Sequence, residues 1–158
     1  MELNDWILAL HLLAAFALVG AEVIFSIQIA SLWGTESTAR VTSFVTLSRV
    51  ATAMVIAGTL GTIVFGVWLA ISIDGYEVWD GWIIAAIVLW AIASELGRRA
   101  GDEYASAATR AGELAAAGTE SSPEVAAAFG ASRGFWLHVA TSVVVLVILV
   151  IMIWKPGA

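Results

Sequence analysis

The sequence predicts an all-α membrane protein, a bundle of four transmembrane helices with a cytoplasmic helical hairpin between the third and the fourth. Composition is the first indication: 61% of the 158 residues are hydrophobic and 13% are charged, whereas soluble domains average about 25% charged residues. The second is four apolar segments, at about residues 6–33, 50–73, 79–96 and 135–154. Each reaches the roughly 18 residues needed to cross a bilayer. The length is typical of one domain, so we expect a single integral membrane domain over residues 1–158.

The basic residues predict the orientation of the spans. Six of the seven lie between the first and second spans or between the third and fourth: Arg40, Arg49, Arg98, Arg99, Arg110 and Arg133. Loops rich in Lys and Arg stay on the cytoplasmic side of a membrane. We therefore expect a cell-membrane protein with loops 34–49 and 97–134 in the cytoplasm and both termini outside. The first residues carry Glu2 and Asp5 but no base, so we expect the first span to be retained and not cleaved as a signal peptide.

The two cytoplasmic segments carry helical signals. Apolar residues at helical spacing in 38–49 predict an extension of the second span, with an irregular loop as the alternative. Residues 98–117 are rich in Ala, Glu and Arg, which favour helix. Ser122 before Pro123 is typical of a helix N-cap followed by its first residue. We expect the third helix to reach about Ala117, a turn at 118–121, and a fourth helix from Pro123; a flexible loop is the alternative.

The second span carries a row of small residues that predicts a close helix–helix contact. In membranes, small side chains let helix backbones approach closely. This row predicts a packing face at the centre of the bundle, with a dimer contact or a surface for a planar cofactor as alternatives. Its members are Ala51, Ala53, Ala57, Gly58, Gly61, Thr62 and Gly66.

Four polar residues are expected at one depth, near the cytoplasmic boundary: Glu22, Arg49, Glu95 and His138. Charges inside a membrane are costly unless they are paired. We expect a structural layer in which Glu22 pairs with Arg49 and His138 with Glu95. A proton or ion relay, a carboxylate–histidine site for a divalent metal, or side chains that reach water without forming a site are the alternatives.

The two histidines also suggest haem b, which axial His and Met ligands can hold between helices. His11 and His138 differ by roughly 18 Å in depth at the helical rise, so one iron cannot bind both. Met54 is expected at the level of His138, which makes a haem between His138 and Met54 geometrically possible.

Several motifs resemble those of a family of four-helix bacterial integral membrane proteins of unknown function. They are His11 in HLLAAFALVG, Arg49 leading into a Gly-rich span, GVWLA at Gly66–Ala70, and a third span that ends at Arg98–Arg99. The chain is more distantly similar to CopD-like and cytochrome b-type four-helix bundles, which implies intramembrane His as haem or copper ligands.

Two functions are therefore considered. The first is a non-enzymatic multi-pass membrane protein, either an accessory subunit or a component that handles ions or small solutes. The second is a haem b-binding electron-transfer protein. The absence of cysteine excludes thiolate sites, and no catalytic motif argues for an enzyme. The expected partners are the lipid bilayer and a second copy or a larger membrane complex, whereas a net charge of −6 argues against nucleic acid.

Overall fold

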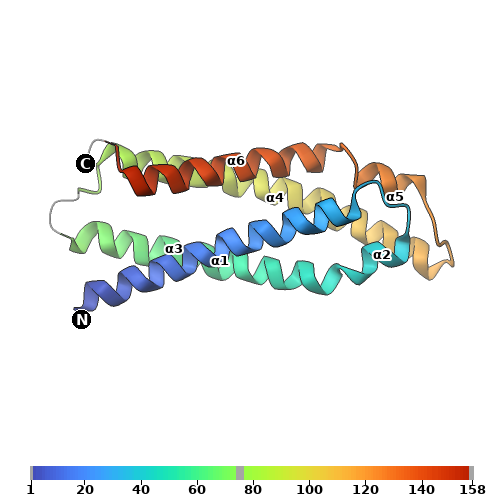
Figure 1. Cartoon of the computed structure of the whole chain (residues 1–158), viewed down its shortest axis with the longest axis horizontal. Helices are drawn as coiled ribbons and strands as arrows, with labels where there is room; N and C mark the ends of the chain where they lie inside the picture. The colour runs from blue at the N-terminus through green and yellow to red at the C-terminus, as the bar shows by residue number, and fades with distance from the viewer. Residues whose placement is uncertain (1, 74–76, 157–158) are drawn as a thin grey trace.

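The computed structural model describes residues 2–73 and 77–156, and within them it contains six helices and no strand. Figure 1 shows long helices lying side by side, with short helices at one end. The all-α prediction is therefore confirmed. The helices are α1 (Leu3–Leu32), α2 (Thr38–Ser43), α3 (Val45–Ser72), α4 (Gly81–Ala116), α5 (Pro123–Ala128) and α6 (Arg133–Trp154).

Four helical segments are long and apolar enough to cross a membrane: α1, α3, α4 and the segment Pro123–Trp154 that contains α6. They contain almost all of the four predicted spans, apart from Trp33, Ile73 and residues 79–80 at the ends. Large apolar side chains point away from the helix contacts; Phe16 and Ile71 are each 70% exposed and Ile153 is 72% exposed. Exposed apolar surface of this extent indicates contact with lipid or with another protein.

The long helices form two pairs, α1 with α3 and α4 with α6. In each pair the two long helices are consecutive in the sequence except for one short helix between them, which is α2 in the first pair and α5 in the second. The beginning of α1 and the end of α6 lie at one end of the molecule, and α2 and α5 lie at the other (Figure 1). Direct contacts between α1 and α6 are found in the half nearer to α2 and α5, including an edge-to-face contact between Trp33 and Phe135 at 4.9 Å.

The α1–α3 contact depends on glycine. A Cβ at Gly58 would lie 2.8 Å from the carbonyl oxygen of Ala14, and one at Gly61 would lie 2.8 Å from the Ala14 side chain. The predicted packing face therefore contacts α1. Its predicted place at the centre of the bundle is wrong, because α3 packs mainly on α1 and leaves Ala53 and Ala57 exposed.

A small core lies at the end of the molecule that contains α2 and α5. We call this part the helical head; it comprises α2, the C-terminal half of α4, and α5. Thr38 at the start of α2 is buried, and its hydroxyl donates to the carbonyl of Thr119 at 2.8 Å. Tyr104 stacks on Phe129 at 5.5 Å, and burial raises the pKa of Tyr104 to about 12. The buried core residues are Leu32, Val41, Ala111, Val125 and Phe129.

Two of the expected helices are interrupted in the structure. The expected continuous extension over 38–49 breaks at Phe44, where α2 ends and α3 begins. The Phe44 carbonyl accepts hydrogen bonds from the Gln28 amide at 3.4 Å and the Ser48 hydroxyl at 3.1 Å. These polar partners, supplied by α1 and α3, accompany the bend between α2 and α3.

The segment between α4 and α6 matches the expected boundaries more closely. Helix α4 ends at Ala116, and the chain turns at Gly118, whose φ of +80° favours glycine. Ser122 and Pro123 begin α5, as expected. However, α5 ends at Ala128 and does not continue into the last span. Helix α6 starts separately at Arg133, where the Ser132 hydroxyl caps it by accepting from the Phe135 N–H at 3.4 Å.

Candidate functional site

The candidate site lies between α1 and α6 and consists of Glu22, Ser26, His138 and Ser142. Glu22 and Ser26 are four residues apart on α1, and His138 and Ser142 are four residues apart on α6. Residues at this spacing lie on the same side of a helix, one turn apart. Each helix therefore presents two polar groups to the other at this level, within otherwise apolar segments.

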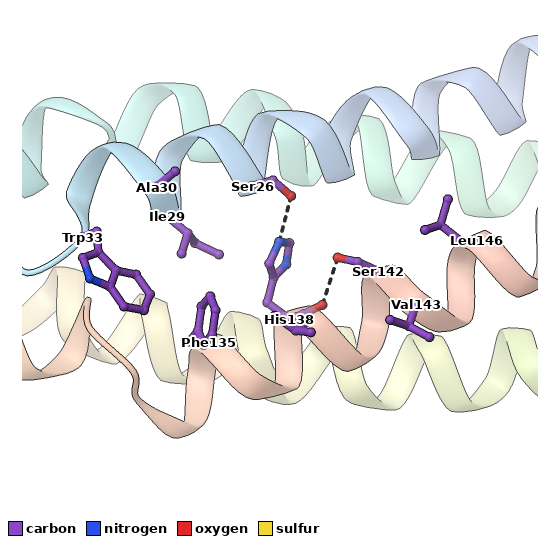
Figure 2. Close-up of a pocket in the computed structure, with 10 residues that line it drawn as sticks. Ser26, Ile29, Ala30, Trp33, Phe135, His138, Ser142, Val143 and Leu146 are labelled. Atoms are coloured by element: carbon purple, nitrogen blue, oxygen red, sulfur yellow. Dashed lines mark hydrogen bonds between the residues drawn. The ribbon is translucent and has the colours of Figure 1, made fainter.

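The histidine ring connects these groups. Its Nε2 is 2.9 Å from the Ser26 hydroxyl, as Figure 2 shows, and its Nδ1 is 3.5 Å from Oε1 of Glu22. The Ser142 hydroxyl forms a short hydrogen bond with the same Glu22 oxygen and also contacts the His138 carbonyl at 3.0 Å. The side chains of Glu22 and His138 are 20% and 11% exposed, respectively. Together these groups form a continuous chain of polar contacts from Ser26 through His138 and Glu22 to Ser142.

An open groove of about 580 Å³ lies beside this chain of contacts, between α1 and α6. Its wall is mostly apolar, with Ile29, Val139, Val143 and Leu146 among the residues that line it. Phe135 lies between Trp33 and His138 at one end, and Leu146 lies at the other (Figure 2). Ser26 lines the groove and is exposed, so the chain of polar contacts begins at the groove surface.

The order serine, histidine, carboxylate is also that of a hydrolase triad. Acyl transfer needs hydrogen-bond donors that stabilise the oxyanion, in addition to an activated nucleophile. Ser26 lies in the middle of α1, where backbone N–H groups are already bonded within the helix. The indole of Trp33 lies beyond Phe135, away from Ser26 and His138 (Figure 2). The geometry therefore suits transfer of a proton between polar groups better than nucleophilic catalysis.

The expected pairing of the four polar residues is wrong. Glu22 contacts His138 and not Arg49, while Arg49 is exposed and has no ion pair within residues 2–73 and 77–156. Glu95 accepts from Arg98 at 2.9 Å and from Arg99 at 2.7 Å on its own helix. Its side chain is 46% exposed, so it forms part of a surface ion-pair network and not of the site.

Other arginines near the helical head also have carboxylate partners. Arg110 contacts Glu113 at 3.1 Å and Glu124 at 3.3 Å, and these carboxylates raise the pKa of its guanidinium above the usual value. Arg133 contacts Glu103 at 3.4 Å. Exposed pairs of this kind contribute little to stability, because water and salt screen them, but they link α4 to α5 and α6.

His11 lies against α3, away from the candidate site. Its Nδ1 is 3.1 Å from the carbonyl oxygen of Thr62. A Cβ at Gly66 would lie 3.0 Å from the imidazole ring, so the glycine makes room for the histidine. The structure gives this predicted ligand a role in the packing of α1 on α3.

The residues considered for haem are not brought together. The Cε atom of Met54 lies 3.1 Å from the position that a Cβ on Gly20 would take. Gly20 and Glu22 are two residues apart on α1, and side chains at this spacing point about 200° apart around a helix. Met54 is therefore on the side of α1 away from Glu22 and His138, and one iron cannot bind both ligands. Within the described ranges, no group of three or more His, Asp or Glu is placed to hold a metal ion.

Ser26 and Ser142 belong to the candidate site but were not predicted from the sequence. Each lies four residues after a residue that was predicted, Glu22 or His138. Both are hydroxyl residues one helical turn from an ionisable residue of an apolar segment, a spacing that can be read from the sequence.

Comparisons of the chain with models of protein families, with curated proteins and with solved structures found no match. The resemblance to the four-helix bacterial membrane family therefore stays a prediction. The fold and the site define a class only: an all-α protein with four helices of membrane-spanning length and a histidine–carboxylate cluster between two of them.

Proposed function

We propose that the chain is a four-span integral membrane protein of the cell membrane, with both termini outside and the helical head in the cytoplasm. The distribution of the basic residues supports this orientation, because six of the seven fall in loops 34–49 and 97–134. The exposed apolar side chains of the long helices then face lipid, which is the partner this proposal requires.

Labelling of single cysteines tests the orientation, since the native chain contains no cysteine. Glu77 precedes α4 and Ala117 follows it, and both are exposed. We expect an impermeant maleimide added to intact cells to modify Glu77→Cys. Ala117→Cys should react only after the membrane is opened. The opposite pattern would show that the head is outside the cell.

We propose further that the protein is a non-enzymatic ion-handling component that binds and releases a proton at the Glu22–His138 pair. The observation that carries this proposal is the sequence of contacts from the exposed Ser26 hydroxyl through the imidazole of His138 to the Glu22 carboxylate. Ionisable residues inside a membrane are costly and typically mark proton or ion pathways. Imidazole is suited to this role, because one ring nitrogen can accept a proton while the other donates one.

The presence of two histidines permits a direct test. In protein labelled with ¹⁵N-histidine, we expect Glu22→Gln to change the ring nitrogen signals of His138 across a pH titration, because it removes the neighbouring carboxylate. The signals of His11 should be unchanged, since its Nδ1 contact is with the Thr62 carbonyl. Equal effects on both histidines, or none on either, would contradict the proposed pairing.

The functional measurement uses proteoliposomes that contain a pH-sensitive dye. We expect the wild-type protein to change the internal pH after an external acid pulse faster than protein-free liposomes do. His138→Gln should remove this difference. His11→Gln serves as the matched control and should retain it, because His11 is outside the cluster. Equal rates for His138→Gln and the wild type would overturn the proposed function.

A further inference from the structure

The groove between α1 and α6 runs along the helices. On α6 it extends from Phe135 to Leu146, which is roughly 16 Å at the helical rise of about 1.5 Å per residue. In the proposed membrane orientation, this direction is close to that of the lipid chains. A long apolar channel of this kind fits a single hydrocarbon chain better than a compact solute.

The contact between Ser26 and His138 lies between the two ends of the groove, with Phe135 on one side of it and Leu146 on the other (Figure 2). His138 follows Phe135 by one helical turn, and Ser26 faces it from α1 (Figure 2). A serine hydroxyl can donate one hydrogen bond and accept two. Within residues 2–73 and 77–156, the only hydrogen-bond partner of the Ser26 hydroxyl is His138. It therefore retains hydrogen-bonding capacity on the groove side, next to an apolar channel.

The electrostatic environment of the Ser26–His138 contact favours an uncharged headgroup. The carboxylate of Glu22 lies behind His138, 3.5 Å from the imidazole Nδ1, and it would repel an anionic headgroup. An ammonium headgroup would have to lose its hydration shell to enter an apolar groove, which is unfavourable. A hydroxyl can both donate to and accept from Ser26, and it carries no charge to desolvate.

From this geometry we infer that the groove binds an uncharged single-chain amphiphile of the monoacylglycerol or long-chain alcohol type. Its hydroxyl contacts Ser26 and its chain lies along Val139, Val143 and Leu146. The inference rests on the proposed membrane location, and it adds a ligand class to the proton site. The bound hydroxyl contacts Ser26, the member of the chain of polar contacts that is exposed in the groove. The bound amphiphile therefore covers this end of the proposed proton pathway.

The experiment uses the full-length protein in phosphatidylcholine nanodiscs, with 1-monododecanoylglycerol as the probe. We expect saturable changes in the ring nitrogen signals of His138 as the probe is added, and no change in those of His11. Val143→Phe fills this part of the groove without altering a polar residue and should weaken binding at least about tenfold, a difference of roughly 1.4 kcal/mol. Ala53→Phe, on an exposed face of α3, is the matched control and should bind as the wild type does.

Three outcomes would overturn the inference. They are signals that change without saturating, equal binding by Val143→Phe and the wild type, and saturable binding of dodecylamine or dodecanoic acid but not of the hydroxyl probe. None of these bears on the proton proposal, which is measured in the absence of probe by the effect of Glu22→Gln on His138. A failure of ligand binding and a failure of the proton site are thus separate results.

Discussion

Gly58→Ala is expected to destabilise the protein markedly, although it adds a single methyl group and alanine favours helix. The new Cβ would lie 2.8 Å from the backbone oxygen of Ala14 and 3.1 Å from the backbone nitrogen of Leu18. Backbone atoms of a helix cannot turn aside as a flexible side chain can, so α1 and α3 must separate. Overpacking of this kind costs about 1–3 kcal/mol, and we expect a clearly lower midpoint of thermal unfolding in detergent.

Gly101→Ala provides the matched control for this variant. Gly101 lies inside α4, and no atom lies within 4 Å of the position its Cβ would take. The same substitution should here stabilise the protein by up to about 1 kcal/mol, because alanine has the higher helix propensity. Opposite shifts in the unfolding midpoint are therefore expected for one chemical change at two sites. A wild-type midpoint for Gly58→Ala would show that α1 and α3 do not approach as closely as described.

A double-mutant cycle on Glu22 and His138 should give a non-additive result. Glu22→Gln and His138→Gln each remove one member of the pair, and each leaves the other in an apolar environment without its partner. We expect both single variants to be destabilised and the double variant to recover part of the loss, with a coupling energy of about 0.5–3 kcal/mol. The measurement is the free energy of unfolding of the four proteins in mixed micelles.

The same cycle on Glu22 and Arg49 supplies the control. Because Arg49 is exposed and Glu22 contacts His138, the effects of Glu22→Gln and Arg49→Gln should be additive. Coupling between Glu22 and Arg49, with additivity between Glu22 and His138, would contradict the candidate site. It would support the Glu22–Arg49 pair that the sequence predicted from depth alone.

The sequence was sufficient to locate the long helices, because hydropathy and length determine which segments can span a bilayer. The breaks at Phe44 and before Arg133 were not foreseen. Both separate helices that could have been continuous, and both depend on tertiary contacts. The Phe44 carbonyl accepts from Gln28 of α1, and the carbonyl of Phe129 accepts from the Gly34 N–H at 3.2 Å. Contacts between distant segments of this kind leave no local signal in the sequence, whereas the cap that Ser132 provides at the start of α6 is a local feature.

The site was only partly foreseen, for a geometric reason. Counting residues from the predicted interface gives the depth of a side chain, and it selected Glu22 and His138. It does not give the direction in which the side chain points around the helix, which changes by about 100° per residue. Arg49 and Glu95 were expected at the same depth, but both are exposed, and Arg98 and Arg99 provide Glu95 with partners on its own helix.

The pairing of α1 with α3 and of α4 with α6 has a consequence for biosynthesis. A chain that emerges from its N-terminus can complete the contact between α1 and α3 while the rest is still being made, since domains generally form in the order of synthesis. Glu22, however, obtains His138 and Ser142 only when α6 arrives. Until then its carboxylate has neither partner within the apolar part of the chain. A nascent or truncated polypeptide that lacks α6 therefore carries an uncompensated acid, which distinguishes it from the finished protein.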